Sequence, residues 1–155
     1  MSGLREPALR LIYRAGFWVL WLTAYLTRPH SRGVKGVLCN GGEVLLVRHT
    51  YGIREWELPG GGQRRHELAS EALVRELREE LEVELGELDP LGTCNGPGQY
   101  SNAVVTFFAA RLANRDVRPD PVEIAEVAWC DPAAPLQPLG WYAAQGLARA
   151  AKSVA

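Results

Sequence analysis

Three consecutive glycines, Gly60, Gly61 and Gly62, stand directly before the strongest helical pattern in the chain. Leucines recur at every fourth residue from Leu73 to Leu81, so a helix over residues 66–84 would carry an apolar face that another element must cover. Glycine lets a backbone approach a ligand closely and exposes its N–H and C=O groups. The segment therefore predicts a helix that packs against another element and that follows a glycine loop with exposed backbone groups.

Short β-rich segments, separated by turn residues, surround this helix. They lie at residues 34–39, 43–47, 56–58, 88–94, 103–112 and 123–130. Asn40 and Gly41 form a tight-turn signal, so the first two segments are predicted to pair as a hairpin. A last helix is predicted at residues 139–152, after a proline-rich link. Strands interrupted by one helix and closed by another predict an α/β sandwich.

Size and composition narrow the class of protein. A chain of 155 residues suits one domain with a substantial core. Its 17 basic and 18 acidic residues give a net charge of −1, which argues against a nucleic-acid binder. The three cysteines, Cys39, Cys94 and Cys130, are widely spaced and form no C-x-x-C pair. This spacing argues against a disulfide framework or a zinc site and predicts a reducing compartment, the cytoplasm.

An apolar run at residues 15–27 lies between Arg14 and Arg28. Its 13 uncharged residues fall short of the roughly 17–25 that a bilayer span needs. No small-residue cleavage site follows it, and Pro29 is placed to end a helix. We expect residues 1–29 to form an added helix that packs against the domain or pairs two copies of the chain, with residues 30–155 as the main domain. Association with a membrane surface, and a signal or anchor role, are less favoured alternatives.

The helix is acidic on one side. Glu76, Glu79 and Glu80 share a helical face, where their like charges repel unless a cation lies between them. Carboxylate oxygens are the ligands that Mg²⁺ prefers. The alternative is a solvated face with ion pairs, such as Arg75 with Glu79 and Arg78 with Glu82.

The glycine loop and the acidic helix together resemble the Nudix box. The matching positions are Gly61, Glu67, Arg75, Glu76, Leu77, Glu79 and Glu80, with Val83 at the closing apolar position. The preceding residues 56–61 also resemble the family's usual lead-in. Glu82 departs from the pattern, because the box has glycine there, and we expect the helix to continue to Gly86. The resemblance implies an α/β/α sandwich with a mixed sheet.

Members of this family hydrolyse a nucleoside diphosphate linked to another group. The resemblance implies that Glu76, Glu79 and Glu80, with the main-chain carbonyl of Gly61, hold Mg²⁺, for which Mn²⁺ could substitute. It also implies that Arg75 orients a carboxylate and that Glu67 locks the loop to the helix.

Three further groups of residues are candidates around this site. Glu79 or Glu123 is the candidate for positioning or deprotonating the attacking water. Arg48 and Arg54 are candidates for binding phosphate or the terminal group of the substrate. Tyr100, and the backbone at Gly61, are further candidates for contact with the substrate.

The sequence indicates the substrate less directly than it indicates the reaction. Within the family, a Pro or a Tyr shortly after the box is associated with different substrates, and Pro97 and Tyr100 both fall near that window. An apolar helix shared by a dimer would help to build a large cleft, so we expect a nucleoside diphosphate sugar or ADP-ribose. The alternatives are a pyrophosphatase acting on (d)NTPs or oxidised nucleotides, and a non-catalytic domain that senses nucleotides.

Overall fold

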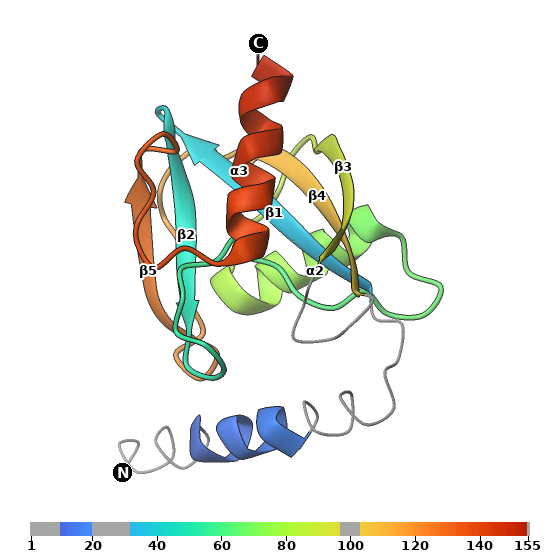
Figure 1. Cartoon of the computed structure of the whole chain (residues 1–155), viewed down its shortest axis with the longest axis vertical. Coiled ribbons are helices and arrows are strands. Elements are labelled where there is room, and N and C mark those ends of the chain that lie inside the picture. The colour runs from blue at the N-terminus through green and yellow to red at the C-terminus, as the bar shows by residue number, and fades with distance from the viewer. Residues whose placement is uncertain (1–9, 20–31, 97–102, 155) are drawn as a thin grey trace.

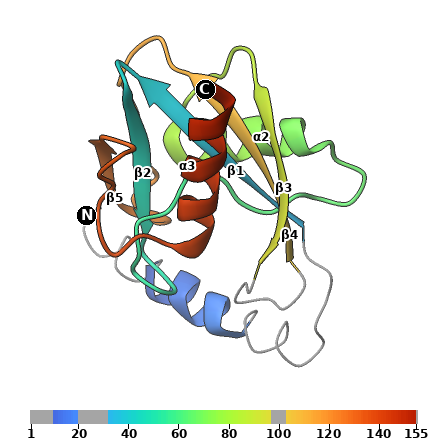
Figure 2. The same cartoon turned by 45° about the horizontal axis from the view of Figure 1, so that its top comes forward.

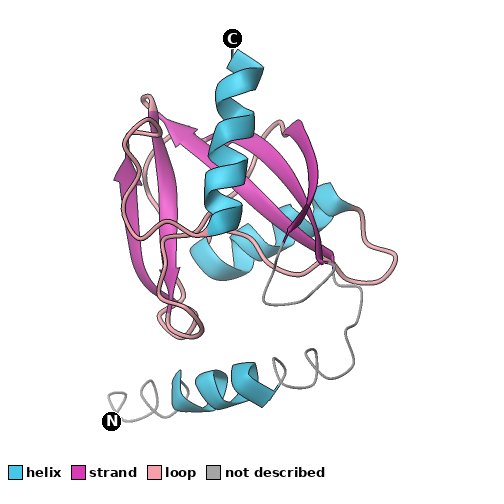
Figure 3. Cartoon of the chain, in the orientation of Figure 1, coloured by secondary structure: helices cyan, strands magenta, loops and turns pink. Residues whose placement is uncertain are grey.

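The structure is a computed structural model, and it describes residues 10–19, 32–96 and 103–154. The main domain has five strands and two helices, shown in Figures 1 and 3. In chain order they are β1 (Arg32–Asn40), β2 (Glu43–His49), α2 (Ala69–Leu81), β3 (Asp89–Gly96), β4 (Ala103–Arg111), β5 (Ile124–Cys130) and α3 (Trp141–Val154). A further helix covers residues 10–19.

The strands form one mixed sheet in the order β3-β4-β1-β2-β5. Strands β1 and β4 run parallel, and the other three pairs are antiparallel. The predicted hairpin is present, because β1 and β2 pair up to Asn40 and Glu43 at the turn. The expected α/β/α sandwich with a mixed sheet is therefore confirmed.

Helices cover both faces of the sheet: α3 crosses one face and α2 the other (Figures 1 and 2). Successive side chains of the central strands point to opposite faces of the sheet, so each strand contributes to the core on both faces. Val34 and Leu38 of β1 pack on the α2 side, whereas Val37 packs on the α3 side. Leu73 and Leu77 of α2 are fully buried against the first layer, as their fourth-residue spacing predicts. The glutamates of α2 lie on an adjacent face, where Glu76 lies against Gly61 and Glu80 is buried.

The expected extension of α2 to Gly86 is wrong. The helix ends at Leu81, and Glu82 adopts the left-handed conformation, with φ 52°. The backbone N–H of Glu82 donates to the Arg78 carbonyl, and Val83 then turns inward and is buried. A left-handed residue at this position ends a helix whether or not it is glycine, although glycine adopts it at lower cost.

The lead-in segment also differs from its prediction. Residues 56–58 make isolated bridges rather than a strand: Glu57 pairs with Val47, and Trp56 pairs with Leu139. Leu58 and Pro59 are buried, so this segment carries the chain through the core on the α3 side and delivers it to the glycine loop.

The helix at residues 10–19 is largely exposed and lies beside the loops at one end of β2 and β5 (Figures 1 and 2). Its outward side carries large apolar residues that are more than half exposed, namely Leu11, Ile12, Trp18 and Val19. One face of this helix contacts the domain, through Arg10 and Phe17, and the other face is exposed. Residues 20–27 of the apolar run lie outside the described residues. None of the described helices is long and apolar enough to cross a membrane.

Candidate active site

The glycine loop is hydrogen-bonded along β1. Val34 N–H donates to the Gly61 carbonyl at 2.9 Å, and Gly36 N–H donates to the Pro59 carbonyl at 2.9 Å. Gly60 lies between these bonds with φ 133°, and a Cβ there would overlap the Val34 carbonyl oxygen. The loop therefore needs glycine at residue 60 in order to lie flat against the strand.

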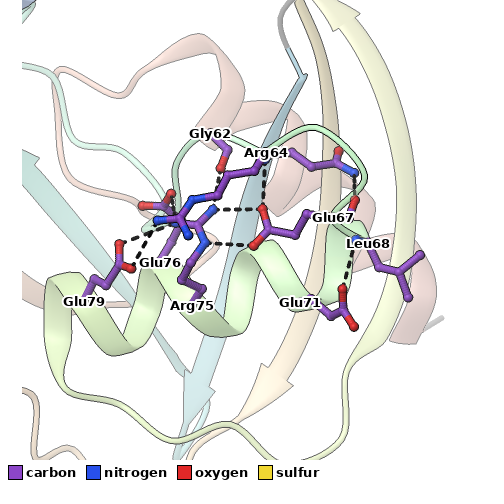
Figure 4. Close-up of polar contacts among 9 residues, drawn as sticks. Gly62, Arg64, Glu67, Leu68, Glu71, Arg75, Glu76 and Glu79 are labelled. Carbon is purple, nitrogen blue, oxygen red and sulfur yellow. Dashed lines mark hydrogen bonds and ion pairs between the residues drawn. The ribbon is translucent and has the colours of Figure 1, made fainter.

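Arg75 joins the loop to the acidic face of α2 (Figure 4). Its Nε and Nη2 donate to the two carboxylate oxygens of Glu67, at 2.8 and 3.0 Å, and Nη2 also donates to the Gly62 carbonyl at 2.9 Å. Its Nη1 donates to Glu76 at 2.6 Å and to Glu79 at 3.4 Å. One planar guanidinium thus fixes the helix, the loop and two of the three clustered carboxylates in one arrangement.

Glu67 binds Arg75 from the loop side. Its carboxylate also accepts the Arg64 backbone N–H at 2.8 Å. The hydrogen bond from Arg75, followed by that from Arg64, lowers the pKa of Glu67 to about 2. Glu67 is therefore an anion at neutral pH, and its hydrogen bonds with Arg64 and Arg75 connect the loop to the helix.

Glu80 is the buried member of the acidic group, with 3 % of its surface exposed. Its Oε2 has no hydrogen-bond partner among the described residues. Burial, and to a smaller degree the charges of Glu76 and Glu123, raise the pKa of Glu80 to about 8, although Lys35 and the Gly60 N–H act in the opposite direction. Such a group is costly to keep ionised unless a cation shares the site.

Glu76 and Glu79 flank this buried carboxylate with different freedom. Glu76 lies directly against Gly61, where an added Cβ would come within 2.5 Å of Glu76 Oε2. The Glu79 side chain is 54 % exposed and also pairs with Arg64 at 3.7 Å. The backbone of Gly61 and the carboxylate of Glu76 are thus adjacent, while Glu79 lies at the solvent edge.

Glu123 comes from the loop before β5 and lies near the same cluster. Asp120 N–H donates to the Glu80 carbonyl at 2.8 Å, which attaches this loop to the end of α2. Burial raises the pKa of Glu123, and the charges of Asp120, Glu76 and Glu79 add to the rise, while a hydrogen bond from Tyr13 opposes it. The negative charges on the acidic helix therefore disfavour ionisation of Glu123, although it comes from a different loop.

Two of the remaining substrate candidates, Arg48 and Arg54, pair with Glu126. Arg48 stacks on the Trp56 ring, 4.4 Å from its centroid, and binds Glu126 at 3.0 Å. Arg54 is exposed and pairs with the same Glu126 at 3.8 Å. Tyr100 and Pro97 lie outside the described residues. Glu126 thus holds both arginines at the β2–β5 edge.

A divalent cation fits the chemistry of the acidic cluster. The carboxylate groups offer only oxygen atoms, and Oε2 of buried Glu80 accepts no hydrogen bond from the described residues. Within the described residues, however, no three Asp, Glu, His or Cys side chains are grouped closely enough to hold a metal ion. The Arg75 Nη1 lies within hydrogen-bonding distance of both Glu76 and Glu79 and draws them toward itself.

Two residues near the site were not predicted. Lys35 of β1 donates to the Leu58 carbonyl at 2.9 Å, and its charge favours the ionised form of Glu80. Tyr13, from the helix at residues 10–19, hydrogen-bonds to Glu123. Alternation along β1 could have flagged Lys35 as a charge in a buried strand. No local pattern could have placed Tyr13 beside Glu123.

Comparison with known proteins agrees with this architecture. The model of the NUDIX domain matches residues 29–150. A comparison with curated proteins gave no significant match.

Several solved structures share the fold. The MutT NUDIX hydrolase from Burkholderia pseudomallei is 22% identical with a TM-score of 0.71, over 77% of this chain and 96% of that one. The NUDIX domain of Shewanella oneidensis NrtR, complexed with ADP ribose, is 22% identical with a TM-score of 0.71, over 82% and 90%. An ADP-ribose pyrophosphatase from Streptococcus suis is 19% identical with a TM-score of 0.65, over 81% and 92%.

Proposed function

Because the chain belongs to the NUDIX family of hydrolases, we propose that it hydrolyses the diphosphate bond of a nucleoside diphosphate linked to another group. The observation that carries the proposal is the buried carboxylate of Glu80 beside Glu76, because its Oε2 has no hydrogen-bond partner among the described residues. A negatively charged diphosphate would be repelled by this cluster alone. A divalent cation bound with the substrate turns that repulsion into attraction.

We assign the cation ligands to Glu76, Glu79, Glu80 and the carbonyl oxygen of Gly61, with Mg²⁺ as the natural ion and Mn²⁺ as a substitute. The Gly61 carbonyl accepts one hydrogen bond from Val34 N–H and keeps a second lone pair for a ligand. When bound, the cation supplies charge neutralisation at the diphosphate and lowers the pKa of a coordinated water.

The protein's own groups supply orientation and proton transfer. Arg75 holds Glu76 through a 2.6 Å hydrogen bond and is held in turn by Glu67, so the carboxylate is oriented before substrate arrives. Glu79 at the solvent edge, or Glu123 across the site, accepts a proton from the attacking water. Glu123 suits this role because burial raises its pKa toward neutrality.

The favoured substrate is a nucleoside diphosphate sugar or ADP-ribose. The ADP-ribose complex of the Shewanella domain and the named activity of the Streptococcus enzyme support this choice. Exposed Arg54 is the candidate for contact with the far end of such a substrate. A (d)NTP or oxidised nucleotide is the alternative substrate, and a domain that senses nucleotides without cleaving them is the alternative function.

The test is a substrate panel with the purified full chain. ADP-ribose, several nucleoside diphosphate sugars, dinucleoside polyphosphates and dNTPs are incubated with and without Mg²⁺, and products are separated by ion-exchange chromatography. We expect Mg²⁺-dependent cleavage of ADP-ribose or a sugar nucleotide, and a loss of about 10²–10⁴-fold in Glu79→Gln. Cleavage of dNTPs alone would overturn the substrate, and binding without cleavage at any pH would favour the sensor.

We also propose that two copies of the chain pair through the outward face of the helix at residues 10–19. Leu11, Ile12, Trp18 and Val19 together leave an apolar patch in water, which a second copy would cover. Ile12→Glu is expected to convert a dimer to a monomer in light scattering, and Leu68→Glu, on an equally exposed leucine elsewhere, is the control. A wild-type monomer would contradict the pairing.

The free thiols of Cys39, Cys94 and Cys130 fit our placement of the protein in the cytoplasm.

A further inference from the structure

The inward face of the helix at residues 10–19 contacts two loops, one of which carries Glu123. Arg10 Nε donates to the Pro121 carbonyl at 2.8 Å. Phe17 packs on the Tyr51 ring at 5.1 Å between centroids, and it lies so close to Gly52 that an added Cβ there would come within 3.1 Å. The side chains of one helical face thus contact two loops that are far apart in the sequence.

These two loops are joined to each other and to α2. Thr50 N–H donates to the Glu123 carbonyl at 2.9 Å, and Thr50 Oγ1 donates to the Val122 carbonyl at 2.6 Å. Asp120 N–H in turn donates to the Glu80 carbonyl. A helix docked on these loops therefore rests on the backbone that sets the position of Glu123.

Tyr13 lies on the same inward face as Arg10 and Phe17, one turn from each. Its hydroxyl donates to the Glu123 carboxylate, and it also lies within the electrostatic influence of Asp120 and Glu79. The contact joins a segment that precedes the sheet to a carboxylate that faces the acidic helix.

We propose that Tyr13 is a positioning residue, which holds the Glu123 carboxylate toward the acidic cluster and makes the N-terminal helix part of the active site. The proposal rests on the function proposed above. Glu123 lies in a loop and is half-buried, so a fixed hydrogen-bond donor removes rotamers in which the carboxylate faces solvent. Phenylalanine at residue 13 keeps the ring and its packing and removes only the donor.

The first experiment measures kcat and KM with the best substrate from the panel. Tyr13→Phe is expected to lower kcat about 10- to 100-fold with KM nearly unchanged, as for other residues that orient a reacting group. In a Glu123→Gln background the same substitution is expected to add no further loss. The matched control is Tyr142→Phe, which removes a hydroxyl that has no hydrogen-bond partner among the described residues and should keep wild-type kcat. Wild-type kcat in Tyr13→Phe, or an equal loss in both backgrounds, would overturn the proposal.

The second experiment needs no activity. The thermal midpoints of the metal-free wild type, Tyr13→Phe, Glu123→Gln and the double variant are compared by calorimetry. If the two residues interact, the double variant should be no less stable than the less stable of the two single variants. Losses in thermal midpoint that simply add would contradict the contact. If the wild type cleaves nothing, the proposed function fails while this cycle still tests the contact. If the wild type cleaves and Tyr13→Phe is unaffected, the positioning role alone fails.

Discussion

Glu80→Gln is expected to abolish hydrolysis and, at the same time, to stabilise the metal-free protein above neutral pH. Hydrolysis should fall about 10²–10³-fold, because a proposed cation ligand and its charge are lost. Stability should rise by about 1–3 kcal/mol at pH 8–9, because glutamine keeps the size of the side chain without an ionised carboxylate to desolvate.

The pH dependence has a definite sign. The pKa of Glu80 is about 8 in the folded chain, whereas its ordinary value is 4.5, so between these pH values the native state keeps a proton that the unfolded state releases. The contribution of Glu80 to stability is therefore fully present below pH 4.5 and is lost as the pH rises toward 8. In Glu80→Gln this loss should disappear.

Urea unfolding at pH 5, 7 and 8.5, with a chelator present, measures this difference. Glu87→Gln removes the same charge from an exposed position and should leave both activity and the pH slope unchanged. A Glu80→Gln protein that is less stable than wild type at pH 8.5 would contradict the cost assigned to the buried carboxylate.

The second large effect concerns the loop itself: Gly60→Ala should destabilise the protein by about 3–5 kcal/mol. Positive φ costs a non-glycine residue about 1–3 kcal/mol, and forcing a methyl group into the Val34 carbonyl costs about as much again. Because the Gly60 N–H donates to Glu80, displacement of the loop should also remove activity in whatever fraction stays folded.

Gly62→Ala is the matched comparison, two residues along the same loop. A Cβ at residue 62 meets nothing within 4 Å, and its φ lies outside the positive range that strains other residues. We expect a change within about 0.5 kcal/mol, as for surface substitutions away from special features. Equal midpoints in urea for the two variants would show that the close approach of the loop to β1 is not what requires glycine.

The sequence predicted the parts of the site that depend on local periodicity. The fourth-residue spacing of Leu73, Leu77 and Leu81 gives the buried face of α2, and the clustered glutamates then fall on an adjacent face. The end of the helix could not be predicted in this way. Glu82 takes the left-handed conformation because Val83 gains burial beyond it, and that gain depends on the sheet rather than on the residue itself.

Contacts between distant segments could not be predicted from local patterns. Arg48 stays a candidate for binding phosphate, and its stacking on Trp56 and its pairing with Glu126, opposite it in β5, were not foreseen. Tyr13 carried no signal, because its partner Glu123 is far along the chain. Such pairs become visible only once the folded chain brings distant segments together.

The topology also determines at which stage of chain synthesis Glu123 can join the carboxylates of α2. The glycine loop rests on β1, but β1 pairs with β4, which follows much later in the sequence. The loop that carries Glu123 and binds the Glu80 carbonyl comes later still, directly before β5. A nascent chain that has exposed only the glycine loop and α2 already carries three of the carboxylates on one helix, but it lacks the loop that brings Glu123 to them. Glu123 joins them only after most of the sheet is available, and folding through such non-local pairings is slow.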